Sequence, residues 1–251
     1  MYFESHAHFD DRRFKEDREE LMELLPSCGI DYVVNVGCDI KSSKQSIRLA
    51  ERYDYVYAAV GIHPHELYDM SSQTIEELRR LSEHKKVVAI GEMGLDYYYD
   101  RHPRELQQFW FRQQLRLAES VNKPVIIHSR DASQETFDIM TTSNVRQGVI
   151  HCYSGSAPMA VEYTKMGFYI GIGGVITFPN AKKLVEVVDA IPLEKILIET
   201  DSPYLSPAPN RGKRNDSRNL EYIVNEIAKI KGETSEKVAE ITNKNAQKLF
   251  F

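Results

Sequence analysis

The feature that most constrains this chain is an alternation of short apolar runs with longer amphipathic stretches. It repeats eight times, and the apolar runs cover residues 2–8, 32–37, 56–61, 87–92, 124–128, 148–151, 168–172 and 196–201. Strands that alternate with helical segments argue for a parallel sheet covered by helices, and strands without clean polar alternation fit a sheet buried on both faces. Eight such units in 251 residues predict a closed TIM (β/α)8 barrel of α/β class rather than an open doubly wound sheet.

The amphipathic stretches between these runs predict helices over residues 16–25, 41–53, 74–82, 105–121, 131–140, 159–166, 181–190, 219–229 and 235–250. We expect Asp131 to cap the helix that starts there. In the longest helix, one side is predicted to carry Leu106, Phe109, Trp110, Gln113 and Leu117. No linker or low-complexity segment divides the chain, so residues 1–251 are predicted to form a single barrel domain.

Composition excludes several classes of protein. No apolar run approaches the roughly 18 residues of a membrane span, and the N-terminus lacks the basic and apolar regions of a signal peptide, so we expect a cytoplasmic protein. Cys28, Cys38 and Cys152 are far apart and form no CxxC pair, which predicts free thiols. The net charge of −5 argues against an extended nucleic-acid surface. A site that handles one phosphodiester at a time would need only a local basic patch.

Polar residues gather at the predicted strand ends, where a (β/α)8 barrel places its chemistry. Six of the eight histidines lie there, and the carboxylates of Glu92 and Asp201 join them; the histidines are His6, His8, His63, His65, His128 and His151. Neutral imidazole is the commonest protein ligand for a metal ion. His6 and His8 are two residues apart on one strand and therefore project from the same face. This concentration predicts a metal site.

Four histidines with Glu92 and Asp201 are too many ligands for one tetrahedral ion, which takes about four. They suit two ions about 3.5–4 Å apart that share a bridging carboxylate. Glu92 stands near the middle of the set along the chain, so it is the natural bridge. Two-metal sites favour hydrolysis of phosphate esters, because one ion can activate water while both stabilise charge on the phosphoryl oxygens.

On these residues the chain resembles a TatD-type deoxyribonuclease, a metal-dependent hydrolase on a TIM barrel. The resemblance spans essentially the whole chain, and its motifs keep their order and spacing. They cover residues 5–10, 61–65, 91–96, 125–128, 151–155, 199–203, 211–215 and 245–250.

The resemblance implies a role for each ligand. His6, His8 and Asp201 would hold one ion, His128 and His151 the second, and Glu92 would bridge them. Asp201 would also accept a proton from the attacking water. The implied activity is hydrolysis of DNA phosphodiester bonds, typically trimming from the 3′ end, with two divalent ions. Imidazole-rich sites suit Zn or Mn, whereas nucleases often use Mg.

Two positions depart from the pattern of this family. Glu4 stands where the family usually has Asp, and Asp216-Ser217 stands where it usually has Glu-Pro. Neither position is an implied ligand, so the departures concern the geometry behind the ligands or the choice of substrate.

Strand alternation predicts that Glu4 and Glu199 point inward, one layer below the ligands. Buried charges are rare unless they are paired or hydrogen-bonded. Our hypothesis is that one of these carboxylates accepts a hydrogen bond from a ligand imidazole and fixes its tautomer. The alternative is a salt bridge to a buried Lys or Arg.

Several further residues are candidates for substrate binding. Arg211 and Arg214 lie in a basic stretch, residues 211–218, that we expect to hold phosphate. Arg130 is a second phosphate candidate. His63, His65 and Tyr153 are expected to touch substrate or leaving group. The run Tyr97-Tyr98-Tyr99 either stacks on a base or packs on the barrel rim.

Other functions remain open at this point. A small-molecule amidohydrolase would commonly carry a carbamylated lysine near the end of strand 4, and no lysine lies between Lys86 and Lys123. A deacylase of aminoacyl-tRNA is a nearer variant, since the same ions would serve to cleave esters. A non-catalytic metal-binding scaffold is disfavoured by the complete ligand set. DNA is the expected partner, with no membrane and no obligatory protein partner.

Overall fold

The computed structural model describes residues 1–251, and its centre is one eight-stranded parallel sheet. The strands follow one another in chain order: β1 (Tyr2–Ala7), β2 (Ile30–Val36), β3 (Val56–Val60), β4 (Val87–Asp96), β5 (Val125–Arg130), β6 (Gly148–Ile150), β7 (Tyr169–Ile172) and β8 (Ile196–Ile198). The sheet curls until β1 meets the chain after β8, where Ala7 and Ser202 form an isolated parallel bridge. The backbone N–H of Asp201 also donates to the carbonyl of His6 at 3.0 Å. The predicted (β/α)8 barrel is confirmed as a nearly closed barrel.

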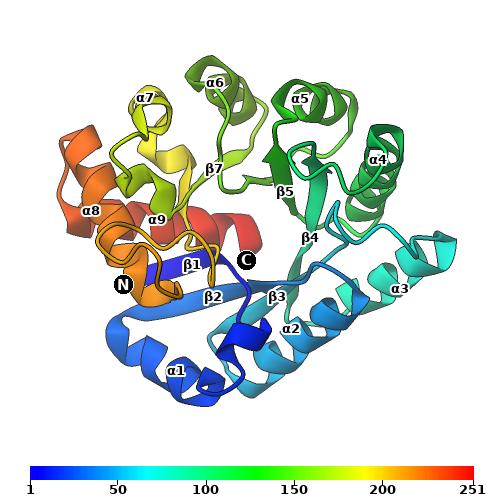
Figure 1. The fold of residues 1–251 in the computed structure, drawn as a ribbon, viewed down its shortest axis with the longest axis horizontal. Coiled ribbons are helices and arrows are strands. Elements are labelled where there is room, and N and C mark those ends of the chain that lie inside the picture. Colours follow the sequence, from blue (N-terminus) through cyan, green and yellow to red (C-terminus); the bar gives the residue numbers. More distant parts are fainter.

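Helices surround this barrel as an outer layer (Figure 1). They are α1 (Arg18–Leu24), α2 (Ile40–Arg52), α3 (Ser72–Ser82), α4 (Arg104–Ser120), α5 (Ser133–Thr142), α6 (Ala157–Lys165), α7 (Lys182–Ala190), α8 (Leu220–Lys231) and α9 (Ser235–Phe250). Short 3-10 turns supplement them. None of these helices is long and apolar enough to cross a membrane.

The predicted start of α5 is wrong. The helix begins at Ser133 after Ala132, and no side chain caps it. Asp131 instead adopts a positive φ of 52°, a conformation that Asp tolerates better than most residues. It therefore forms the turn between β5 and α5 rather than the helix cap.

The buried face of α4 also differs from the prediction. Phe109 is 50% exposed, whereas Gln107 and Gln114 are buried. Each glutamine pairs with one backbone position: Gln114 accepts from the N–H of Ile62 at 2.8 Å and donates to its carbonyl at 2.9 Å. Gln107 makes the same pair of bonds with the backbone of Asp96. Apolar periodicity does not predict this face of α4, because the residues that bind the strand ends there are glutamines.

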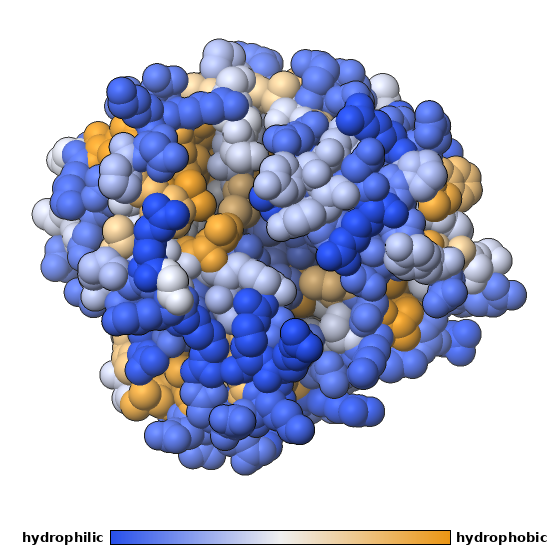
Figure 2. Space-filling model, viewed as in Figure 1, coloured by the Kyte–Doolittle hydropathy of each residue, from blue (hydrophilic) through white to orange (hydrophobic).

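The two ends of the barrel interior differ in chemistry. Ile126 and Leu197 belong to a buried apolar cluster that also takes in Phe250 at the end of α9. Ile126 lies two residues before His128, and Leu197 two before Glu199, so each shares a strand face with that polar residue. This cluster forms an apolar layer beneath the polar residues. Figure 2 shows one face of the molecule as largely hydrophilic and hollowed near its middle.

Candidate metal centre

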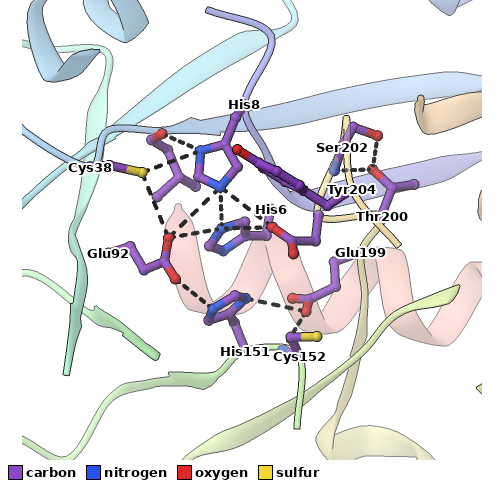
Figure 3. A network of polar contacts seen from close by, with 12 residues as sticks. His6, His8, Cys38, Glu92, His151, Cys152, Glu199, Thr200, Ser202 and Tyr204 are labelled. Atoms are coloured by element: carbon purple, nitrogen blue, oxygen red, sulfur yellow. Dashed lines mark hydrogen bonds and ion pairs between the residues drawn. The ribbon is translucent and has the colours of Figure 1, made fainter. Parts of the chain in front are cut away.

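The carboxylate of Glu92, in β4, faces several of the predicted ligands, and Figure 3 shows its contacts with His6, His8 and His151. Its Oε1 is 2.9 Å from His128 Nδ1 and 2.7 Å from His151 Nε2. Its Oε2 faces the other pair, 3.5 Å from His6 Nε2 and 3.7 Å from His8 Nε2. Each carboxylate oxygen thus addresses a separate pair of imidazoles. This is the arrangement expected of a carboxylate that bridges two ions.

Asp201 approaches the same centre from the chain after β8. Its Oδ1 lies 3.4 Å from His8 Nε2 and 3.8 Å from His6 Nε2. The predicted eighth strand runs to residue 201, but β8 ends at Ile198. The reason is that the N–H of Thr200 donates to the Glu4 carboxylate and Asp201 takes a positive φ of 54°. This uncommon conformation turns the Asp201 side chain toward the β1 histidines.

The nitrogen atoms at this centre fit a bound cation. Nδ1 of His8 lies 2.8 Å from the carbonyl of Val36, so it carries the proton and Nε2 presents a lone pair. That atom is 3.1 Å from Nε2 of His6, and the oxygens of Glu92 and Asp201 surround both. The buried Nδ1 of His6 has no hydrogen-bond partner. Four electron-rich atoms that converge in a buried place are stabilised by a positive ion between them.

The pKa values of these side chains depend on one another. Burial opposes ionisation of Glu92, but the charge of His151 and hydrogen bonds from His128 and His151 hold its pKa well below the usual value. Burial lowers the pKa of His151, but Glu92 and Glu199 outweigh it, and the net pKa is raised well above the usual value. Burial, together with the neighbouring His128 and His65, lowers the pKa of His63 well below its usual value despite Glu92. His63 is therefore a neutral imidazole at neutral pH.

Asp96 is a functional candidate that the sequence reasoning missed. Its Oδ2 lies 3.1 Å from Nε2 of His128 and 3.0 Å from Nε2 of His65. Burial opposes its ionisation, but bonds from His128, His65 and the amide of Tyr99 hold its pKa below the usual range. A carboxylate behind an imidazole fixes the ring and its tautomer. Strand alternation in the sequence indicates this position, because Glu92, Gly94 and Asp96 lie two residues apart on one extended strand and share a face.

His63 and His65 stand beside the centre rather than within it. The backbone N–H of His65 donates to Nδ1 of His63 at 3.1 Å, so the proton of His63 is on Nε2. That N–H faces the centre, 3.7 Å from Oε1 of Glu92. Nε2 of His65 turns away, toward Asp96. The structure thus brings His63 to the centre as a hydrogen-bond donor and sets His65 behind it.

The two inward carboxylates predicted below the ligands have different surroundings. Oε1 of Glu199 lies 3.5 Å from Nδ1 of His151 and accepts a short bond from the amide of Cys152. Glu4 touches no imidazole ring: it accepts bonds from the Thr200 hydroxyl at 2.6 Å and the Ser217 hydroxyl at 2.8 Å. Neither carboxylate pairs with a Lys or Arg. The geometry therefore brings only Glu199 close to a ligand imidazole, and because Nδ1 of His151 makes no hydrogen bond at this distance, the predicted bond stays a prediction.

The two departures from the family pattern meet in space, since Ser217 donates its hydroxyl proton to Glu4. Proline at position 217 would have no hydroxyl to donate. Burial raises the pKa of Glu4 to about 8, and its hydroxyl partners act against that rise. The longer side chain at position 4 and the hydroxyl at position 217 thus form one hydrogen-bonded unit beneath the centre.

Two of the residues predicted to contact substrate have protein partners in the structure. Arg214 turns to Asp17, with an Nη1–Oδ1 distance of 2.7 Å, and donates to the Arg13 carbonyl. Tyr153 is buried, and its hydroxyl donates to the carbonyl of Ser156 at 2.9 Å. Both side chains are already satisfied and hold loops in place. Arg211 forms no ion pair and stacks on Phe178 at 4.1 Å, so it stays a candidate.

One thiol also lies at the centre. Sγ of Cys38 is 3.7 Å from Nδ1 of His8 and 3.9 Å from Oε2 of Glu92. Burial raises its pKa to about 11, so it is a neutral thiol. The prediction of free cysteines is consistent with the structure, in which all three are unpaired.

This combination of fold and site defines a class: the metallo-dependent hydrolases built on a barrel of parallel strands. The crystal structure of the Escherichia coli phosphotriesterase homology protein shares the fold, with a TM-score of 0.72 at 14% identity over 100% of this chain and 98% of that one. The crystal structure of YjjV, a TatD homolog from Escherichia coli K12, matches with a TM-score of 0.94 and 31% identity, covering 99% and 97% of the two chains.

Sequence comparison narrows the class to one family. The family model described as TatD related DNase matches residues 3–251. YabD of Bacillus subtilis, described as an uncharacterized metal-dependent hydrolase, is 43% identical over 100% of this chain and 99% of its own. YcfH of Escherichia coli K12, described in the same words, is 33% identical over 98% and 94%. The chain belongs to the TatD family and is a metal-dependent hydrolase.

Proposed function

We propose that this protein is a deoxyribonuclease that cleaves phosphodiester bonds with two divalent ions and trims DNA from the 3′ end. The observation that carries the proposal is the position of Glu92, whose two oxygens face separate pairs of histidines. His6, His8 and Asp201 would hold one ion, and His128 and His151 the other. When bound, the ions would activate water and stabilise charge on the phosphoryl oxygens.

Side chains of the protein would perform the other steps of the reaction. Asp201 has a pKa below its usual value, because hydrogen bonding and charge from the β1 histidines outweigh its burial. It is therefore ionised at neutral pH and can accept the proton of the attacking water. His63, neutral with its proton on Nε2, can donate a hydrogen bond to a phosphoryl oxygen or to the leaving oxygen. Arg130 and Arg211 would hold neighbouring phosphates.

The test is a substrate panel given to protein loaded with Mg²⁺, Mn²⁺ or Zn²⁺. It contains single-stranded DNA, double-stranded DNA, an aminoacyl ester and a phosphotriester. We expect DNA cleavage that Glu92→Gln reduces by at least about a thousandfold, as for loss of a central electrostatic group. Glu186→Gln, an exposed change on α7, is the matched control. Metal content is measured for each variant.

Two results would contradict the proposal. One is a Glu92→Gln variant that keeps its metal content and still cleaves DNA. The other is turnover of the aminoacyl ester without turnover of DNA, which would instead support an esterase. Labelling the 3′ or the 5′ end of the DNA reads out the direction of trimming.

A further inference from the structure

Three buried polar atoms around the metal centre have no hydrogen-bond partner in the protein. They are Nδ1 of His6, Nδ1 of His151 and Oε2 of Glu199. His6 and Glu199 are fully buried, and His151 is 4% exposed. One ligand atom of each residue lies within 4.8 Å of the other two. Buried polar groups are almost always hydrogen-bonded, so three that lie together without partners indicate a shared role.

The two imidazoles of this cluster form a parallel pair. The ring centroids of His6 and His151 are 3.9 Å apart, and the ring planes differ by 10°. Nε2 of His151 is 2.7 Å from Oε1 of Glu92, and Nε2 of His6 is 3.5 Å from Oε2 of Glu92. Both rings therefore present Nε2 to the same carboxylate, which leaves Nδ1 of each ring for another partner.

Glu199 reaches this pair from the end of β8. Its backbone N–H continues the pairing with β7 by donating to the carbonyl of Ile172 at 3.2 Å. Its Oε1 accepts the bond from the amide of Cys152 and lies 3.5 Å from Nδ1 of His151. Figure 3 shows the His151 ring between this carboxylate and that of Glu92.

A glycine in β7 makes room for the Glu199 carboxylate. A Cβ added to Gly171 would lie 2.6 Å from Oε2 of Glu199 and 3.0 Å from Cα of His151. Contacts this short force a shift, so any larger residue at position 171 would displace the carboxylate or the strand. The barrel wall is thus shaped to hold Glu199 beside the imidazole pair.

The chemistry of imidazole defines what Glu199 does there. A ring that offers the lone pair of Nε2 to a cation carries its proton on Nδ1. With ions bound at the centre, the Nδ1 atoms of His6 and His151 are therefore both buried donors. Glu199 pairs with no lysine or arginine, so its charge is available to them. A separation within 4.8 Å is spanned by a direct bond or by one bridging water.

We infer that Glu199 is the shared acceptor for the Nδ1 protons of His6 and His151, and that it thereby couples the affinities of the two ions. The inference rests on the proposed function, in which His6 holds one ion and His151 the other. Glu199 is thus a positioning residue for both ions. Asp96, by contrast, faces only one of these ligands, His128. The first ion to bind fixes a carboxylate that the ligand of the second ion also uses, which favours binding of the second.

Metal binding, measured separately from cleavage, tests the inference. Calorimetric titration of the metal-free protein with Mn²⁺ is expected to show two ions per chain. Glu199→Gln keeps the size of the side chain but removes its charge, and we expect both ions to bind about 10–100-fold more weakly. Asp96→Asn should weaken only one of them. Glu194→Gln, an exposed change just before β8, is the control.

The imidazole protons provide a second readout that does not depend on affinity. In protein saturated with Zn²⁺ and carrying isotope-labelled histidine, the Nδ1 protons of His6 and His151 should exchange slowly with water and give two magnetic-resonance signals. Glu199→Gln should lose both signals, whereas Asp96→Asn should keep them. Gly171→Ala moves the carboxylate without removing it and should also lose both, so it decides the question if Glu199→Gln does not fold. Unfolding temperature shows which variants are folded.

Two outcomes overturn the inference. One is a folded Glu199→Gln variant in which at most one ion binds more weakly. The other is a wild-type protein that binds three ions, of which Glu199→Gln loses one, because the cluster would then hold a cation instead of accepting protons. Two ions that both depend on Glu199, in a protein that cleaves no DNA, would support the inference and overturn the proposed deoxyribonuclease. The two failures are therefore distinguishable.

Discussion

At the residue scale, the orientation of each imidazole depends on a partner behind it. Val36 directs His8 through its carbonyl, Glu199 lies against His151, and Asp96 lies against His128. A hydrogen bond to one ring nitrogen leaves the other nitrogen free to present its lone pair, as for His8 beside Val36. We therefore expect the chemistry to depend on residues that touch neither substrate nor an ion.

Asp96 provides the clearest test at this scale. Asp96→Asn keeps the shape of the side chain but removes the charge that faces His128 and His65. Loss of such a partner typically weakens metal affinity about 10–100-fold. Titration calorimetry with Mn²⁺ checks this, with Asp100→Asn on the exposed loop as the control. An unchanged metal affinity would show that Asp96 serves only to hold the backbone of Tyr98 and Tyr99.

At the element scale, amide side chains of α4 hold the backbone at the carboxyl ends of β3 and β4. Gln114 satisfies the backbone of Ile62, which precedes His63, and Gln107 satisfies that of Asp96. The helix thereby holds both flanks of the centre. Its polar residues are buried because the backbone beyond a strand end has no neighbouring strand to bond.

Substitution of Gln114 should therefore lower the free energy of unfolding more than expected for a polar residue. Gln114→Leu leaves the buried N–H and carbonyl of Ile62 without partners, at about 1–3 kcal/mol for an unsatisfied group. Urea unfolding is expected to show this loss of stability. The neighbouring Gln113→Leu, which breaks no hydrogen bond of this kind, should have a much smaller effect. Equal losses in the two variants would contradict the role given to Gln114.

At the scale of the whole molecule, the centre joins strands that are far apart in sequence. Its residues come from β1, β4 and β5 and from the chain after β6 and β8. An ion that binds only the folded barrel stabilises it by mass action, by about 2.7 kcal/mol at a hundred times its dissociation constant. Metal binding and folding are thus coupled.

This coupling is expected to depend on pH. Contacts with Cys38 and Asp201 raise the pKa of His8, and Glu92 and Glu199 raise that of His151, each against the effect of burial. These imidazoles hold protons until the pH exceeds their raised pKa, and an ion must displace those protons. The rise in unfolding temperature on adding Mn²⁺ should therefore grow as the pH rises beyond about 6.5, the ordinary histidine value. Thermal unfolding with and without EDTA measures it, and a shift that shrinks as pH rises would contradict this account.

The sequence by itself determined the barrel and the residues that gather at one end of it. The strand rhythm is local and strong, because each strand is apolar on both faces and each helix has one apolar side. Alternation placed His6 beside His8, and Glu4 and Glu199 inside. The last helix is predicted with the bounds that α9 has in the structure.

Tertiary structure alone decided what each polar group faces. Arg214 sits in a basic stretch, yet Asp17, from the start of the chain, holds its guanidinium. Tyr153 follows His151, yet its hydroxyl belongs to Ser156. Asp96 stands behind His128 because β4 extends beyond Glu92. Periodicity reports which face a residue occupies, whereas its partners depend on contacts between distant segments that no local pattern records.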